Sequence, residues 1–442
     1  MNGARVLTVV SDLGIGGTQR AAQNLALAYA RLGCPSGVLA FRAGGPRAQV
    51  LLDREIDVFA PGTTADPVAA ASGWRPDLVH VHRAGFEDAA SAAVLERLHS
   101  EGVARIIETS VFGQPDYSPA GDLIDLHAHV SMWSAWRWAQ QARWRRRRSP
   151  ACVLHNACDT DAFVLGGPEP ASVRASAGIP EDAFVVGRVG QPSEAKWSHH
   201  TVAAFTSFAR VCDDAWLLLV GPPPRVRAQV ASLPGATRCR VTVLEPLADD
   251  VALVATYRAI DVFLHSSAIG ESFGMVLAES MCCARPVVTL STPGRDNGQC
   301  EVVGDGVGGL VCTSTRELVD GLIRLSEDGD LRRLLGARGR GRVEQFFGLD
   351  AIGTRLGTIA GAVLDGPRDT LEDRLRGLLG AEMEERLTAH LGTPPDDPTE
   401  RLVSSAIHDR GPSAPLASYV MNHPARHLRR HPVSLAKGAL RR

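Results

Sequence analysis

The chain has 442 residues, and its 47 Lys and Arg nearly balance its 49 Asp and Glu, which gives a net charge of −2. At about 100–200 residues per domain, this length predicts two or three domains. Near-neutrality excludes a generally basic nucleic-acid-binding protein, and a hydrophobic content of 45% excludes a disordered chain. Nine cysteines without a CxxC pair indicate reduced thiols and a cytoplasmic protein. No apolar run approaches the ~18 residues of a membrane span.

Short apolar runs alternate with segments of helical period along most of the chain. The strand candidates are residues 6–10, 78–82, 105–108, 183–189, 216–220, 241–244, 261–265 and 286–290. The clearest helical candidates are residues 18–32, 201–211 and 274–283. Buried parallel strands that alternate with helices are typical of an α/β doubly wound fold, and the pattern runs twice.

Breaker residues predict the domain boundaries. The cluster Gly-Gly-Pro-Glu-Pro at residues 166–170 suits a link between a first domain, 1–166, and a second domain, 167–345. A helix over 346–365 is expected to return to the first domain. Residues 366–442 are predicted to form a charged helical extension and a basic tail.

A glycine-rich turn follows the first predicted strand. Gly14, Gly16 and Gly17 precede a helix, so the backbone could approach a ligand closely while the helix N-terminus offers N–H groups to an anion. The spacing is neither a dinucleotide fingerprint nor a P-loop. The alternative is a tight turn that merely needs glycine.

Two acidic residues, Glu271 and Glu279, have seven residues between them and lie where a predicted strand leads into a helix. Ligands of open parallel sheets bind at the carboxyl ends of strands, so a helix beginning near Phe273 would direct its first N–H groups at a phosphate. The alternative is that Glu271 is a capping residue and Glu279 a solvated helix residue.

Two cationic residues, Arg188 and Lys196, follow one another near the end of the strand predicted at 183–189. A guanidinium fork and an ammonium at one strand terminus suit a diphosphate. The alternative is a pair of solvated surface charges.

Together these motifs resemble the retaining GT-B glycosyltransferases of the group 1 set, family 4. The resemblance covers about residues 6–364. The matching segments, in the family's order, are 16–20 (glycine loop), 75–82 (the "PDVVHVH" strand), 154–163 (the "NGVD" segment), 187–189 with Lys196 ("GR…K"), 271–279 (E-x7-E) and 286–288. The family implies two Rossmann-like doubly wound domains that face a central cleft.

The resemblance also implies roles for individual residues. The donor-binding residues would be Gly16, Gly17, Arg188, Lys196, Leu244, Glu271, Ser272, Phe273, Gly274, Met275 and Glu279. Glu271, Arg188 and Lys196 would be the catalytic residues among them. Gln19, Arg20 and His82 would face the acceptor.

The activity implied is transfer of a sugar from a UDP- or GDP-hexose type of donor to a glycan, lipid or small-molecule acceptor, with retention of configuration. No metal and no cofactor beyond the nucleotide sugar are expected. Three positions depart from the family: residues 108–111 lack the histidine of Thr-x-His, Ala284 replaces a glycine, and Trp197 follows Lys196. The missing histidine leaves one alternative open, a catalytically silent GT-B scaffold, although Glu271, Arg188 and Lys196 argue against it. A GT-B epimerase or phosphorylase is another.

Three further features have competing interpretations. Residues 133–148 interleave tryptophan with arginine, which suits peripheral contact with anionic lipid or, alternatively, a helix whose indoles pack inside the first domain. Asp159 and Asp161 resemble a metal-binding D-x-D, but their turn favours a structural role. His80 and His82 alternate along a strand, and at most one is expected to face a ligand.

Overall fold

The computed structural model describes residues 1, 3–85, 88–103, 105–142, 149–163, 169–293 and 295–375. The chain divides into two compact units: unit 1 contains Met1–Ala157 and the residues from Leu349 onward, and unit 2 contains Cys158–Gly348. The chain therefore passes between units beside Ala157 and beside Gly348. Most of the Gly-Pro cluster predicted as the link lies outside the described residues.

Unit 1 is built on a seven-stranded parallel sheet in the order β3-β2-β1-β4-β5-β6-β7. The strands are β1 (Val6–Asp12), β2 (Ser36–Ala43), β3 (Asp57–Phe59), β4 (Leu78–Arg83), β5 (Ile106–Ser110), β6 (Leu126–His129) and β7 (Ala151–Val153). Apolar side chains of the central strands are buried on both faces, as expected for strands covered by helices on each side.

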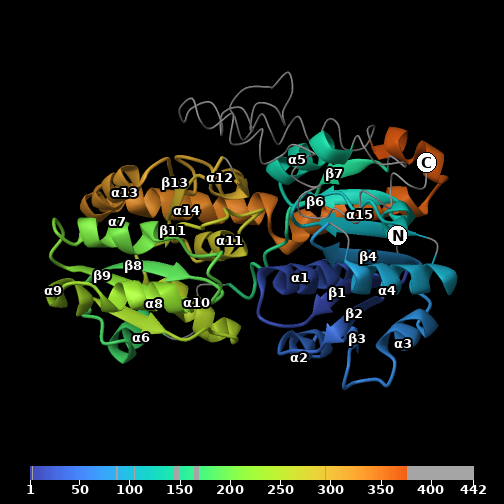
Figure 1. Ribbon diagram of the computed structural model, residues 1–442, viewed down its shortest axis with the longest axis horizontal. Coiled ribbons are helices and arrows are strands. Elements are labelled where there is room, and N and C mark those ends of the chain that lie inside the picture. The colour runs from blue at the N-terminus through green and yellow to red at the C-terminus, as the bar shows by residue number, and fades with distance from the viewer. Residues whose placement is uncertain are drawn as a thin grey trace. The chain divides into compact units, whose positions relative to one another are not determined.

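The helices of unit 1 cover both faces of this sheet (Figure 1). They are α1 (Gly17–Arg31), α2 (Arg47–Leu52), α3 (Pro67–Gly73), α4 (Ala89–Ser100), α5 (Met132–Ala142) and α15 (Leu349–Leu364), with 3₁₀ turns at Pro119–Leu123 and Arg368–Thr370. Helices α1 and α15 share one hydrophobic core, and α3 and α4 contribute to the other.

Helix α15 packs against α1, although more than 300 residues separate them in the chain. Ile352, Leu356 and Ile359 enter the same core as the buried residues of α1, and the Arg355 guanidinium donates to the carbonyl of Val153 at 2.8 Å. The sequence had predicted a helix over 346–365 that returns to the first domain.

Unit 2 contains a six-stranded parallel sheet in the order β10-β9-β8-β11-β12-β13. Its strands are β8 (Phe184–Val189), β9 (Ala215–Val220), β10 (Val241–Leu244), β11 (Val262–His265), β12 (Val287–Leu290) and β13 (Gly309–Cys312). Its helices are α6 (Pro170–Ser176), α7 (His200–Phe208), α8 (Pro224–Ala231), α9 (Gly235–Arg238), α10 (Asp250–Ala259), α11 (Met275–Cys282), α12 (Gly298–Val303), α13 (Thr315–Glu327) and α14 (Gly329–Phe346).

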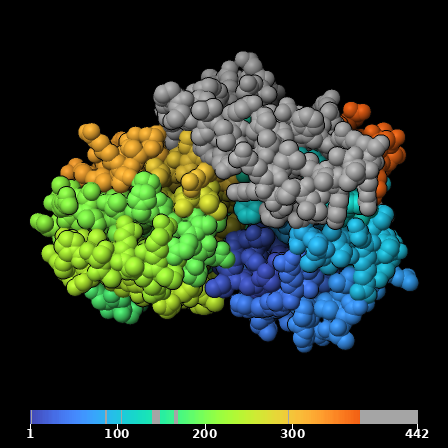
Figure 2. Space-filling view, in the orientation of Figure 1, coloured from blue at the N-terminus to red at the C-terminus, as the bar shows by residue number. Residues whose placement is uncertain are grey.

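One face of this second sheet is covered by α7 and α13, which lie side by side at the surface of unit 2 (Figures 1 and 2). Phe205 of α7 and Leu322 of α13 are both buried in the core that they form with the sheet. Two Rossmann-like α/β units are therefore present, as the sequence predicted.

In each sheet the strand order reverses once, between β1 and β4 in unit 1 and between β8 and β11 in unit 2. Neighbouring connections leave in opposite directions at such a point, so the loops at the carboxyl ends of the strands separate and leave room for a ligand. The loop after β1, the loop after β8 and the loop after β11 begin at these two places. These loops contain Gly16, Lys196 and residues 271–274 of the predicted site, and helices α1 and α11 begin where the first and the third of them end.

Candidate functional site

The carboxyl ends of β8 and β11 bring together Lys196 and Glu271, 75 residues apart in the chain. The Lys196 Nζ lies 2.6 Å from Glu271 Oε2. The Lys196 side chain is 28% exposed and that of Glu271 only 10%. The carboxylate of Glu271 is therefore nearly buried, whereas the Lys196 side chain is more exposed to solvent. The structure thus pairs two residues that the sequence had assigned to one ligand.

The second oxygen of the same carboxylate meets a histidine that the sequence analysis did not identify as functional. His265, the last residue of β11, places Nε2 at 3.3 Å from Glu271 Oε1 and Nδ1 at 3.0 Å from the hydroxyl of Thr289 on β12. Burial, and then the charge of Arg188, lower the pKa of His265 to about 4 despite the bond to Glu271. The imidazole is therefore neutral at physiological pH.

Glu271 stays ionised although it is buried. Burial alone would raise the pKa of its carboxyl, but the Lys196 ammonium and the His265 hydrogen bond outweigh that effect and hold its pKa well below the usual range. An ionised carboxylate accepts hydrogen bonds only, so Glu271 could accept one from a sugar hydroxyl.

The loop that carries Glu271 is fixed by the segment that leads into α12. The backbone N–H of Glu271 donates to Oε1 of Gln299 at 3.0 Å, and the hydroxyl of Ser272 donates to Asp296 at 2.8 Å. Gly270 has a φ of +73°, and a Cβ there would lie 1.7 Å from the carbonyl oxygen of Asp296. Only glycine fits this position, since it needs both a left-handed backbone and the close approach.

Helix α11 begins two residues later than the sequence suggested. Gly274 caps it with a φ of +97°, and the first helical residue is Met275 instead of Phe273. Phe273 is buried in an edge-to-face contact with Phe347. The first-turn N–H groups of a helix have no acceptor within the helix, and they attract an anion. At α11 they adjoin the Glu271 loop.

Arg188 is a buried residue, not the solvated surface charge of the alternative interpretation. It is 1% exposed, and its two terminal nitrogens donate to the carbonyls of Val189 at 2.5 Å and Lys196 at 3.0 Å. Its Nε is buried without a partner. Burial lowers the pKa of Arg188 to about 10, against the opposing charge of Glu271. In this structure Arg188 supports the backbone of Lys196.

Trp197, which departs from the family's glycine, explains how this arginine is held. The indole is fully buried, its ring centroid lies 5.0 Å from the Arg188 guanidinium carbon, and its N–H donates to the carbonyl of Gln191 at 2.8 Å. A guanidinium over an indole face is stabilised by the ring quadrupole. The tryptophan therefore supports the charge instead of disrupting the loop.

Glu279, the second acid of the E-x7-E pattern, lies within α11 and is 4% exposed. It accepts a hydrogen bond of 3.0 Å from the hydroxyl of Tyr257 on α10. Burial first, and then the charge of Glu279, raise the pKa of that phenol well above its ordinary value. The alternative of a solvated helix residue is therefore wrong for Glu279.

Leu244, another predicted donor-binding residue, is the last residue of β10, and its carbonyl accepts a hydrogen bond of 3.0 Å from the N–H of Gly221.

In unit 1 the glycine loop follows β1 as expected, and α1 begins at Gly17 with Gly16 as its cap. Asp12 holds the turn: its carboxylate accepts from the N–H of Gly14 and from the amide of Gln19, each at 3.0 Å. Arg20 is buried in α1. The Gln19 side chain thus bonds to Asp12 in this structure. The assignment of Gln19 to the acceptor stays a prediction.

His82 ends up buried, and both of its ring nitrogens lack a hydrogen-bond partner. Burial lowers its pKa to about 3. Its ring lies 5.4 Å from that of His80, which bonds to Tyr29 and Thr109. Both histidines therefore lie on one face of β4. Alternation along the strand therefore does not separate them, because residues two apart on a strand share a face. That at most one of them faces a ligand stays a prediction.

A buried ionic network is centred on Glu108 of β5, the strand that leads into the segment without the family's Thr-x-His histidine. Glu108 on β5 accepts from Arg83 at 2.5 Å and lies 2.5 Å from the ring of His127 on β6, and Arg83 also donates to Asp116 at 2.7 Å. All four residues are buried. Local sequence pattern does not reveal this network, because the register of β4, β5 and β6 brings Arg83, Glu108 and His127 together.

The described part of the segment 133–148 packs inside unit 1. Trp133 and Trp138 on α5 are buried, Trp138 lies against the rings of His127 and His129, and Arg137 donates to the carbonyl of Phe112 at 3.1 Å. Residues 143–148 lie outside the described residues. These two indoles favour the packing interpretation over the lipid-facing one.

In the part of the chain that the structure describes, no cluster of His, Cys, Asp or Glu side chains could hold a metal ion. Asp159 accepts from the backbone N–H groups of Asp161 and Ala162, each at 3.2 Å, so it closes its own turn. Among the same described residues, no helix is both long and apolar enough to cross a membrane.

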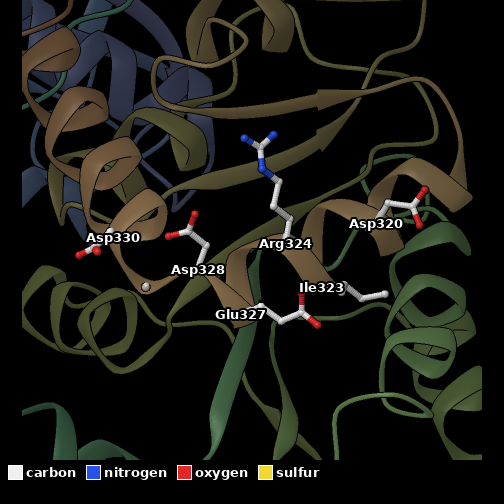
Figure 3. A pocket seen from close by; sticks show the side chains of 7 residues that line it. Asp320, Ile323, Arg324, Glu327, Asp328 and Asp330 are labelled. Atoms are coloured by element: carbon white, nitrogen blue, oxygen red, sulfur yellow. The ribbon is translucent and has the colours of Figure 1, made fainter.

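A separate hollow of about 520 Å³ lies where α13 meets α14 (Figure 3). Its lining is mainly acidic and consists of Asp320, Ile323, Arg324, Glu327, Asp328, Gly329 and Asp330. Asp328 caps α14 by accepting the N–H of Leu331 at 2.8 Å, and Asp330 pairs with Arg333. Excess negative charge makes this hollow unsuitable for a diphosphate.

Two Rossmann-like units with strand-end sites define the fold of the GT-B glycosyltransferases, and solved structures agree. A glycosyltransferase of Rickettsia africae superposes with a TM-score of 0.67 at 15% identity, over 83% of this chain and 100% of that one. Anabaena Alr3699/HepE, solved in complex with UDP-glucose, superposes with a TM-score of 0.63 at 21% identity, over 80% and 98% of the chains.

Sequence comparison then points to one family. Residues 155–328, which lie almost wholly in unit 2, match the family described as Glycosyl transferases group 1. A D-inositol 3-phosphate glycosyltransferase of Kineococcus radiotolerans is 31% identical over 230 residues, 48% of this chain and 50% of that protein. One from Acidothermus cellulolyticus is 32% identical over 252 residues, 54% and 49% of the chains. The aligned part spans about half the length of these curated relatives.

Proposed function

We propose that this protein is a glycosyltransferase that moves a sugar from a nucleoside-diphosphate sugar, of the UDP- or GDP-hexose type, to a glycan, lipid or small-molecule acceptor. The observation that carries the proposal is the Lys196–Glu271 pair at the reversal point of the second sheet, beside the first turn of α11. It combines a cation for a diphosphate with a carboxylate for sugar hydroxyls.

The proposed chemistry follows from these charges. Breaking the glycosidic bond of the donor creates an oxocarbenium-like sugar and adds negative charge to the leaving diphosphate. Lys196, the first-turn N–H groups of α11 and the positive field of Arg188 would stabilise that charge. We propose that the reaction needs no metal. Configuration at the anomeric carbon would be retained, with the leaving phosphate accepting the proton of the acceptor hydroxyl.

The relatives support the proposal at the level of the donor. The Anabaena protein was solved in complex with UDP-glucose, and two of the curated relatives are named D-inositol 3-phosphate glycosyltransferase. We propose a nucleotide sugar as the donor. We do not narrow the acceptor to D-inositol 3-phosphate, because the alignment covers only about half the length of those relatives.

The test is a thermal-shift panel of UDP-, GDP-, ADP- and TDP-sugars, because a ligand that binds only the folded state raises its apparent stability. The stabilising donor is then incubated with candidate acceptors, and NMR of the product reports the anomer. Transfer with retained configuration supports the proposal. Donor binding without turnover would favour the silent scaffold, and release of an epimerised or phosphorolysed sugar would favour the other alternative.

We also propose that the protein is cytoplasmic. Peripheral contact with anionic lipid through residues 133–148 is tested by flotation with anionic liposomes.

A further inference from the structure

The environment of Glu271 distinguishes its two partners. Lys196 contacts Oε2 from a flexible side chain that is 28% exposed, whereas His265 contacts Oε1 from a ring that is fully buried in β11. A diphosphate that enters this site will compete for the Lys196 ammonium, which is a mobile point charge. The histidine has no such freedom.

The tautomer of His265 follows from its neighbours. A hydrogen bond to the ionised Glu271 requires the proton on Nε2, and a neutral imidazole has only one N–H. Nδ1 must therefore accept a hydrogen bond, and the hydroxyl of Thr289 at 3.0 Å is the donor. The Thr289 hydroxyl thus selects the tautomer in which His265 donates to Glu271.

Burial first, and then the charges around the ring, keep His265 neutral. Arg188 on β8 and Lys196 in the following loop are both close enough to oppose a second proton on His265, while Glu271 favours it. An imidazolium would add a third cation to the two that are already there. The neutral ring provides one directed hydrogen bond without changing the charge that a diphosphate meets.

We propose that His265 is a positioning residue for the transfer reaction: it keeps Oε1 of Glu271 fixed while Lys196 moves from Oε2 to the donor diphosphate, and Thr289 fixes the orientation of its N–H. Oε2 then becomes free to accept a hydroxyl of the donor sugar. The proposal rests on the proposed function, because it assigns Glu271 to that sugar.

The experiment compares three variants with the wild type, using the donor that stabilises the protein most in the panel. His265→Leu removes the donor to Glu271, His265→Gln keeps an N–H at a similar reach, and Thr289→Val removes only the hydroxyl. Thr256→Val is the matched control, since Thr256 is buried on α10 and its hydroxyl bonds to the carbonyl of Ala252 in its own helix. Calorimetry gives the donor Kd and the fraction of competent sites, and initial rates give kcat and KM.

We expect His265→Leu to lower kcat between about 10-fold and 100-fold, since misplacing a positioned group by 1 Å can lower the rate about 100-fold. The donor Kd should change by less than about threefold, because Lys196 and α11 still bind the diphosphate. His265→Gln should recover most of the loss, Thr289→Val should lie between the two, and Thr256→Val should match the wild type.

Outcomes separate the two proposals. If the wild-type protein neither binds a nucleotide sugar nor transfers a sugar, the proposed function fails. If the wild type is active but His265→Leu retains its kcat, or if His265→Gln is as impaired as His265→Leu at equal site occupancy, the positioning role is overturned. A purely structural role would lower the fraction of competent sites and leave kcat per site unchanged.

Discussion

Arg188 and Trp197 form a buried cation–aromatic pair directly behind Lys196, with the guanidinium carbon 5.0 Å from the centroid of the indole. Since Arg188 donates to the Lys196 carbonyl, the pair connects the hydrophobic core of unit 2 to the backbone of the cationic residue at the site.

This connection predicts a graded response to substitution of Trp197. Trp197→Phe keeps an aromatic face but loses the N–H bond to Gln191, which is worth about 1 kcal/mol. Trp197→Leu also loses the face, and a desolvated cation–π contact contributes on the order of 2 kcal/mol. Urea unfolding and donor calorimetry should both rank the wild type first, Trp197→Phe second and Trp197→Leu last. Equal donor affinity in all three would contradict the connection.

Removal of either member of the Lys196–Glu271 pair should abolish transfer without unfolding the protein. Loss of one preorganised group that stabilises developing charge typically lowers turnover about 100-fold to 1000-fold, so Lys196→Ala and Glu271→Ala should fall at least that far. Circular dichroism should stay native. The matched control is Arg316→Ala, which removes an exposed ion pair with Asp320 on α13. Wild-type rates in Lys196→Ala or Glu271→Ala would rule out the assignment of this pair to catalysis.

Gly270 should tolerate no side chain. An added Cβ would lie 1.7 Å from the Asp296 carbonyl oxygen in a backbone with φ of +73°, so Gly270→Ala must displace the loop that carries Glu271. We expect the thermal shift caused by the donor to disappear. Gly235→Ala provides the control, because a Cβ there meets nothing within 4 Å. An unchanged thermal shift in Gly270→Ala would mean that the loop is not part of the donor site.

Ala284 should be a site of easy stabilisation. It ends the α11 turn with a φ of +53°, where the family usually has glycine, and a left-handed non-glycine residue is unfavourable by about 1–2 kcal/mol. Glycine relieves this strain but also adds entropy to the unfolded chain, which lowers stability by about 0.4–1 kcal/mol. The net effect of Ala284→Gly should be to raise the free energy of unfolding by up to about 1 kcal/mol. Gly336→Ala should do the reverse, since its Cβ would lie 2.3 Å from the Ala284 carbonyl oxygen. Denaturant titration of both variants decides the matter.

The buried neutral histidines should make the protein sensitive to acid. Burial lowers the pKa of His265 to about 4 and the pKa values of His82 and His129 to about 3. Between the unfolded value near 6.5 and these folded values, only the unfolded chain takes up the proton, so stability falls as pH falls. Each histidine contributes up to about 1.4 kcal/mol per pH unit in that window.

His265→Gln removes one such group and should flatten the pH dependence of the unfolding of unit 2 between pH 6 and about 4, as measured by urea titration at several pH values. A slope identical to that of the wild type would show that His265 binds its proton equally in both states.

Much of the fold could be predicted from local pattern. All eight strand segments named from the sequence are present, since central parallel strands are short runs of Val, Leu and Ile bounded by turns. Five strands were not predicted, namely β2, β3, β6, β7 and β13. Of these, β3 and β7 have only three residues each, and alternating histidines in Leu126–His129 hide the character of β6. The left-handed cap was predictable at Ala284, where the helix stops before a strand.

What the sequence determined by itself is therefore the doubly wound pattern, the positions of its turns and the residue types available at them, because periodicity, glycine and helix signals act over a few neighbouring residues. Only the tertiary structure decided which of those residues meet. His265 became a partner of Glu271, Arg188 became a buried support, and Glu108 joined Arg83 through the register of adjacent strands and the burial that helices impose on them. Such contacts depend on residues far apart in the chain, and local signals do not report them.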